Sequence, residues 1–242
     1  MMIPNIADWQ TKLFKDRHQA GLELAKRLTR YAGDDPVVLA LPRGGLSIGL
    51  EVAKALQSPL DVVIARKIGL PHNKEFGIGA ISEGNIRILD ERIINLIGIN
   101  QNMLKDILEE EQAELQRRIE VYRNNKPLPD VRNKTVILVD DGLATGVTAK
   151  AAIEAIRKLH PKRIVFAAPI CAYDTAQQLR SLVDDVVCLA TPYDLMAIGY
   201  WYQNFEQVTD EEVLDLLKYA REHNKKKVIE GGNHTKQNGL SL

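Results

Sequence analysis

A short apolar run that ends in two acids constrains this chain more than any other feature. Residues 136–139 read Val-Ile-Leu-Val and are followed at once by turn residues, which predicts a buried strand. Asp140 and Asp141 come directly after this strand. A Gly/Thr-rich loop then leads into a predicted helix with apolar residues at positions 151, 153, 156 and 159. Repeated units of this kind elsewhere in the chain predict a mostly parallel sheet covered by helices on both faces.

The loop after the acids, residues 142–148, has the composition of an anion site. Backbone N–H groups at a helix N-terminus point outward at the positive end of the helix dipole. Gly142 and Gly146 allow the backbone to approach a ligand closely, and the hydroxyls of Thr145 and Thr148 can donate to phosphate oxygens. This loop therefore predicts a phosphate site.

The two acids suit another part of the same ligand. A phosphate would repel the carboxylates of Asp140 and Asp141, so we expect them to accept hydrogen bonds from a ribose diol or to face a developing positive charge. A P-loop is excluded, because Gly142 and Gly146 have only three residues between them and Val147 stands where lysine is required. A phosphatase is a weaker alternative, since it would need Asp-x-Asp rather than adjacent acids.

The run Asp-Asp-Gly-Leu-Ala-Thr-Gly-Val-Thr at 140–148 resembles the motif that binds 5-phosphoribosyl diphosphate (PRPP) in type I phosphoribosyltransferases. The resemblance implies a Rossmann-like fold with a flexible loop or hairpin and a small C-terminal hood. It implies Mg2+ held mainly through PRPP, with no metal ligand supplied by the protein, and a homodimer. The residues that it assigns to the sugar phosphate are Asp140, Asp141, Gly142, Leu143, Ala144, Thr145, Gly146, Val147 and Thr148.

A second loop, Pro42-Arg43-Gly44-Gly45, follows a predicted strand at 37–41 and resembles the pyrophosphate loop of the same family. The Arg43 guanidinium and the amides of Gly44 and Gly45 can all reach a diphosphate, whereas a bulky residue would obstruct it. A surface turn is the alternative for this loop taken alone. Because both loops follow parallel strands, we expect them to converge at one edge of the sheet.

Arg66 and Lys67 follow a predicted strand at 62–65, in a segment similar to the one that leads into the flexible loop of adenine-type and orotate-type members. The resemblance implies that both cations contact pyrophosphate and that residues 69–80 close over it, which would shield a cationic sugar centre from water. Exposed charges at a strand end are the alternative. The catalytic residues expected on this basis are Asp140, Asp141, Arg43 and Lys67.

Residues 192–202 resemble the hood that covers the nucleobase, with Met196 and Trp201 as the expected base contacts. Three aromatic residues at 200–202 also suit a hydrophobic hood core or a dimer contact. In the hypoxanthine-guanine enzymes an acid that transfers a proton occupies the place of Ala144. Alanine can transfer no proton, so the sequence disfavours hypoxanthine and guanine as acceptors.

Composition agrees with one enzyme-sized unit. The 242 residues carry 32 basic and 32 acidic side chains, so no net charge favours nucleic acid or membrane as a partner. The first ten residues lack a signal-peptide pattern and no segment has a spanning length, which predicts a cytoplasmic protein. In a reducing compartment, Cys171 and Cys188 are expected to be buried free thiols.

The remaining elements follow from periodicity and turn residues. The predicted helices lie at 13–28, 46–56, 103–122, 174–182 and 211–219, the further strands at 164–170 and 185–189, and a hairpin at 76–81 and 86–89. Residues 1–223 are expected to form a single phosphoribosyltransferase-like domain, and residues 224–242 a disordered basic and polar tail.

Two functions stay open at this point. The first is Mg2+-dependent transfer of the phosphoribosyl group from PRPP to a nitrogen nucleophile, expected to be a nucleobase, with release of pyrophosphate. The second is a PRPP-sensing regulator that kept the pocket and lost the transfer activity.

Overall fold

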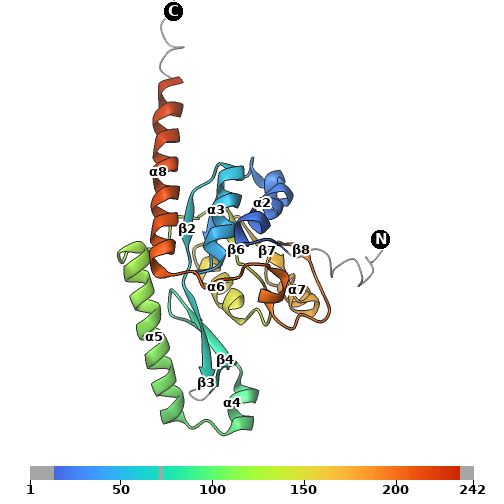
Figure 1. The fold of residues 1–242 in the computed structure, drawn as a ribbon. Helices are drawn as coiled ribbons and strands as arrows, with labels where there is room; N and C mark the ends of the chain where they lie inside the picture. The colour runs from blue at the N-terminus through green and yellow to red at the C-terminus, as the bar shows by residue number, and fades with distance from the viewer. Residues whose placement is uncertain (1–13, 71–72, 235–242) are drawn as a thin grey trace, which may run out of the picture.

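The fold centres on a five-stranded parallel sheet (Figure 1), seen in a computed structural model that describes residues 14–70 and 73–234. The strand order is β2-β1-β6-β7-β8, and every neighbouring pair is parallel. The strands are β1 (Pro36–Ala40), β2 (Leu60–Val62), β6 (Thr135–Val139), β7 (Arg163–Ile170) and β8 (Asp185–Ala190). The predicted mostly parallel sheet is confirmed.

Helices cover both faces of this sheet, as predicted. Helices α2 (Arg17–Leu28) and α3 (Gly45–Leu56) pack on the face that includes Val38 and Ala40. Helices α6 (Val147–Arg157) and α7 (Tyr173–Leu179) pack on the other face, which includes Val37 and Leu39. Because side chains alternate between the faces of a strand, β1 and its neighbours must be apolar throughout to fill both cores.

The two loops of interest leave neighbouring strands. From β1 the chain crosses outward to β2, whereas β6 pairs with the other side of β1 and continues toward β7 and β8. The strand order therefore changes direction between β1 and β6. In open α/β sheets the carboxyl ends of the strands at such a point form the usual ligand site.

A second, antiparallel sheet contains β3 (Ala65–Leu70), β4 (Asn73–Ser82) and β5 (Ile86–Leu89). The predicted hairpin is confirmed, and it extends away from the parallel sheet (Figure 1). The predicted single strand at 62–65 is wrong, because the chain changes sheets at Val63 and Ile64. The Ile64 amide donates to Glu83 Oε1 at 2.8 Å, and the Ser82 hydroxyl donates to the Ile64 carbonyl at 2.8 Å.

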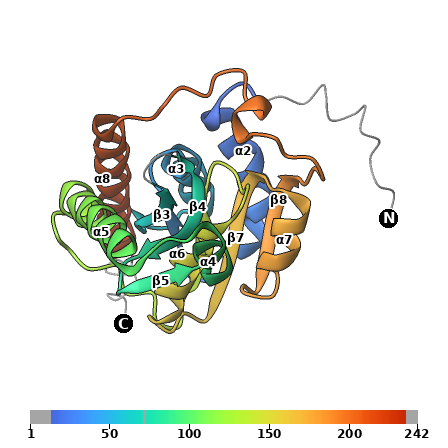
Figure 2. The ribbon, with the colours of Figure 1, turned by 90° about the horizontal axis from the view of Figure 1, so that it is seen from below.

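Three further helices flank the hairpin and the sheet. These are α4 (Glu91–Ile97), α5 (Gln101–Arg123) and α8 (Asp210–His234), and the end of α5 meets the first turns of α8 (Figures 1 and 2). Short 3-10 helices occur at η1 (Thr29–Tyr31) and η2 (Ile198–Trp201). In the described part of the chain, no helix is long and apolar enough to cross a bilayer.

Both ends of the described chain differ from the expectation. The first helix begins at Arg17 rather than at 13, because the Asp16 side chain caps it by accepting from the Gln19 amide at 2.8 Å. At the other end, the backbone of residues 224–234 is helical, whereas a disordered tail was expected from 224. Lysine is a good helix former, and a helix that has already nucleated adds residues at little cost. Residues 1–13, which include the expected start of the first helix, and residues 235–242 lie outside the described chain.

The prediction of free thiols is wrong, because Cys171 and Cys188 form a disulfide. Cys188 lies on β8, and Cys171 follows the end of β7, the neighbouring strand. The Cys171 amide donates to the Ala190 carbonyl, which holds the two segments in register. Pairing of adjacent strands thus brings together two residues 17 positions apart in the sequence.

Candidate functional site

The loop after β1 and the acids after β6 meet at the sheet edge, as expected. A Cβ added to Gly44 would lie 1.9 Å from Asp141 Oδ2, and one added to Gly45 would lie 2.8 Å from the Val139 carbonyl oxygen. The Leu41 amide also donates to that carbonyl at 2.8 Å. The backbone of the 42–45 loop therefore touches the acid pair so closely that only glycine fits at position 44.

Each acid has one carboxylate oxygen held by the protein. Asp140 Oδ1 accepts from the Asp141 amide at 2.8 Å, and Asp141 Oδ2 accepts from Arg17 Nε at 2.8 Å. Within the described residues, the second oxygen of each carboxylate has no protein hydrogen-bond partner. Two hydroxyl groups, such as those of a diol, could donate to these oxygens.

Burial governs the electrostatics of the pair. Burial, and then repulsion by the neighbouring Asp141 carboxylate, raises the pKa of Asp140. Burial also raises the pKa of Asp141, although the Arg17 guanidinium opposes this by favouring the ionised form. The site is therefore short of positive charge and stabilises a hydrogen-bond donor or a cation beside the acids.

The predicted phosphate loop opens α6 as expected. Gly146 is the N-cap residue in the left-handed region, with φ of 70°, and no side chain among the described residues caps this helix. Two hydrogen bonds hold the loop against β7 and α7. The Leu143 amide donates to the Ile170 carbonyl at 2.8 Å, and the Thr175 hydroxyl donates to the Ala144 carbonyl at 2.6 Å. Ala144 and Thr145 face solvent, while Val147 and Thr148 are half-buried. A rigid loop with first-turn amides at its open side has the geometry of an anion site.

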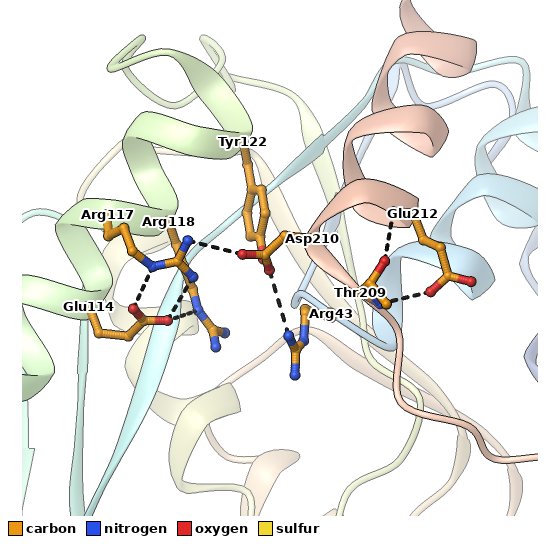
Figure 3. Close-up of polar contacts among 8 residues, drawn as sticks. All are labelled: Arg43, Glu114, Arg117, Arg118, Tyr122, Thr209, Asp210 and Glu212. Atoms are coloured by element: carbon orange, nitrogen blue, oxygen red, sulfur yellow. Dashed lines mark hydrogen bonds and ion pairs between the residues drawn. The ribbon is translucent and has the colours of Figure 1, made fainter.

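Arg43 contributes to a polar cluster between α5 and α8 (Figure 3). Its Nη1 lies 3.7 Å from Asp210 Oδ1, and Arg117 Nη1 donates to Asp210 Oδ2 at 3.0 Å. Tyr122 also donates its hydroxyl to Asp210, and burial followed by this hydrogen bond raises the pKa of Tyr122 to about 12. Glu114 in turn holds Arg117, which is the main reason why the pKa of Glu114 falls to about 2. Asp210 thus links Arg43, which is predicted to bind pyrophosphate, to the first residue of α8.

Arg66 and Lys67 lie on β3 of the antiparallel sheet rather than on the parallel one. The Arg66 guanidinium contacts Glu111 of α5, with Nε and Nη2 at 2.8 and 2.7 Å from Oε2. The Lys67 side chain packs against Gly77 of β4. Residues 69–80, the predicted closing segment, belong to β3 and β4 except for 71 and 72, which lie outside the described chain. Both cations therefore belong to the hairpin.

The hood approaches the acids through Tyr202, which is one of the three aromatic residues at 200–202 but not one of the expected base contacts. Tyr202 donates its hydroxyl to the Asp141 carbonyl at 2.7 Å, and Ile198 packs against Gly142. Met196 is 87% exposed, and the Trp201 carbonyl accepts from the Phe14 amide at 2.7 Å. Met196, one of the two expected base contacts, therefore lies largely in solvent.

No dedicated metal centre is formed by the described residues, since no three His, Cys, Asp or Glu side chains gather in a metal-binding group. Arg17 already engages one oxygen of Asp141, so the acid pair by itself offers few ligand atoms to Mg2+. This ion is bound by one or two carboxylates together with substrate phosphates and water. The residues present fit an ion that arrives with a phosphorylated ligand.

Comparison with known proteins identifies the family of this chain. Residues 14–200 match the family model described as the phosphoribosyl transferase domain. The chain belongs to this family. The match covers β1, β6 and both loops that meet at the acid pair.

Two members of known sequence or structure are similar to this chain over most of its length. It is 41% identical over 209 residues to a Mycobacterium tuberculosis protein assigned as a phosphoribosyl transferase and found in two strains. This alignment covers 86% of the chain but 47% of the relative, so the chain spans about half the length of the curated relatives it matches. The crystal structure of the protein TT1426 from Thermus thermophilus is 38% identical, with a TM-score of 0.70, and the match covers 85% of this chain and 97% of that one.

Proposed function

We propose that this protein transfers the 5-phosphoribosyl group of PRPP to a nitrogen nucleophile and releases pyrophosphate. One observation carries the proposal: the glycine loop after β1 lies directly against the acid pair after β6, with the phosphate loop of α6 beside it. A diphosphate site, a diol site and a terminal phosphate site then adjoin one another. PRPP is a ligand whose three polar parts have this order.

The sugar phosphate would be held at both ends of the 140–148 segment. The loop 143–148 would bind the 5-phosphate through its amides and the hydroxyls of Thr145 and Thr148. The free oxygens of Asp140 and Asp141 would accept from the 2- and 3-hydroxyls. Their negative charge would also favour the positive charge that develops on the sugar as the bond to pyrophosphate breaks.

The leaving pyrophosphate would lie against the 42–45 loop. The amides of Gly44 and Gly45 and the Arg43 guanidinium would stabilise its charge, once Arg43 exchanges Asp210 for the diphosphate. Arg66 and Lys67 would join them from the hairpin if β3 and β4 move toward the site, as the closing segment of such enzymes requires. Mg2+ held by the diphosphate and ribose oxygens would neutralise the substrate's charge.

The acceptor would approach from the hood, with Met196 and Trp201 as its expected contacts. A nucleobase other than hypoxanthine or guanine suits a site with Ala144 in the loop, because alanine offers no proton-transferring group. The described residues include no evident general base near the acids, so rate enhancement would come from positioning and leaving-group stabilisation. Assembly as a homodimer stays a prediction.

The direct test is pyrophosphate release from PRPP in magnesium buffer with a panel of nitrogenous bases. We expect release with at least one base, and its loss in the double variant Asp140→Asn, Asp141→Asn. The matched control is Asp34→Asn, Asp35→Asn, an adjacent acid pair that precedes β1 at the opposite edge of the sheet. Unchanged turnover in the first variant would refute the role of the acids. Tight PRPP binding without release for any base would indicate a sensor instead.

A further inference from the structure

The side chain of Arg17, at the start of α2, is an unusual contact for the acid pair because it lies 124 residues away in the sequence. It is only 13% exposed, and it makes three defined contacts. Its Nε donates to Asp141 Oδ2 at 2.8 Å, and its Nη1 donates to the Glu206 carbonyl at 2.8 Å. The guanidinium also lies over the Phe205 ring at 3.9 Å.

These contacts fix the orientation of the guanidinium as well as its position. A planar cation bonded at two nitrogens and stacked on a ring cannot rotate away from the carboxylate without losing all three interactions. Phe205 itself stacks on Tyr202 with ring centroids 4.9 Å apart, and Tyr202 donates to the Asp141 carbonyl. One cluster from α2 and the hood therefore holds both the side chain and the backbone of Asp141.

The acid pair needs such a group for an electrostatic reason. Two adjacent carboxylates in a buried setting repel each other and favour protonation. Among the residues that the structure describes, the titratable groups that face Asp141 are Asp140, Arg17 and Tyr202, and of these only Arg17 is a cation. Removal of Arg17 would take away the main contribution among the described residues that offsets the burial of Asp141.

We propose that Arg17 is a positioning residue of the phosphoribosyl site, which holds Asp141 ionised and oriented so that its second oxygen can accept from a sugar hydroxyl. The first helix and the residues after the hood thus serve the substrate site, although neither belongs to the PRPP motif. This inference rests on the proposed function for its ligand. Its electrostatic part concerns Asp141 alone and can be tested without any ligand.

The experiment compares Arg17→Gln, Arg17→Lys and a matched control, Arg30→Gln. Arg30 belongs to the same N-terminal segment, pairs with Asp185 at 2.6 Å and lies over the Tyr31 ring, but it is remote from the acids. Titration with PRPP in magnesium buffer should show about 10- to 100-fold weaker binding for Arg17→Gln at neutral pH. We expect Arg17→Lys to bind PRPP with an affinity between those of Arg17→Gln and the wild type, because it keeps the charge but loses the planar contacts, and Arg30→Gln to match the wild type.

A pH series separates this role from a purely structural one. Loss of the cation raises the pKa of Asp141, so PRPP binding should be lost at a higher pH in Arg17→Gln than in the wild type on acidification. The titration of PRPP itself is common to both proteins and does not contribute to the difference. Equal pH profiles, or an equal loss of affinity in Arg30→Gln, would overturn the inference.

The carboxyl carbon resonance of Asp141, followed by NMR against pH without ligand, completes the test. It should titrate at higher pH in Arg17→Gln than in the wild type or Arg30→Gln. The same pKa in all three would overturn the inference whatever PRPP does. If the pKa rises but the wild type does not bind PRPP, the proposed function fails, while the control of Asp141 by Arg17 stands.

Discussion

Substitution of Gly44 by alanine tests the contact on which the site depends. The added Cβ would lie 1.9 Å from Asp141 Oδ2 and 2.9 Å from Arg17 Nε. Protein Cβ atoms essentially never make contacts shorter than 3.0 Å, so the loop and the carboxylate must separate by about 1.1 Å. The backbone φ of Gly44, −62°, is ordinary for any residue, so the effect comes from the contact and not from backbone strain.

The expected loss of affinity for PRPP follows from the hydrogen bonds that such a movement removes. A hydrogen bond to a charged group contributes about 1.5–3 kcal/mol, and the shift breaks at least the one that Asp141 would accept from the sugar. This loss corresponds to about 10- to 150-fold in the dissociation constant for PRPP. The fold itself should lose about 1–3 kcal/mol, the usual cost of an overpacked contact.

Calorimetric titration of PRPP into Gly44→Ala in magnesium buffer measures this loss, and a thermal melt shows that the variant is folded. Gly33→Ala is the matched control, because a Cβ at Gly33 meets nothing within 4 Å. It should bind PRPP as the wild type does. A folded Gly44→Ala protein with wild-type affinity would refute the reasoning, since the loop would then not lie against a carboxylate that the ligand uses.

Two further predictions concern the surroundings of the site. Replacement of Cys171 and Cys188 by alanine should lower the free energy of unfolding by about 3 kcal/mol, which is the value expected for a disulfide that closes a loop of this size. A reducing agent should lower the denaturation midpoint of the wild type and leave that of the variant unchanged. Asp210→Asn should tighten pyrophosphate binding by up to about fivefold, because it frees Arg43 from an ion pair of modest strength. Weaker pyrophosphate binding in that variant, measured by calorimetry, would show that Asp210 aids Arg43 rather than competing with the ligand.

The central features of the site could be predicted because they are local or follow from sheet geometry. The strand, acids, loop and helix at 136–157 are contiguous, and each residue type has a local reason. Gly44 and Asp141 are nearly a hundred residues apart in the sequence. They still lie at the same edge of the sheet, because each follows the carboxyl end of one of two neighbouring parallel strands. Hydrophobic periodicity and sheet topology were therefore enough to predict that these two loops meet.

Contacts that depend on side-chain packing across the fold could not be predicted. Arg17 and Tyr202 reach Asp141 from 124 and 61 residues away, and neither lies in the PRPP motif. The same is true of Asp210, which contacts Arg43 from the first residue of α8. The disulfide was missed for a related reason, because the spacing of the two cysteines does not show that their strands are neighbours.

The central claim, that the acid pair and the two loops bind one PRPP molecule, is tested most directly by calorimetry in magnesium buffer. We predict saturable binding at a single site per chain, tighter for PRPP than for ribose 5-phosphate or pyrophosphate alone, and lost in the Asp140→Asn, Asp141→Asn variant. No heat on addition of PRPP to the folded wild-type protein, or equal binding by the double variant, would contradict it.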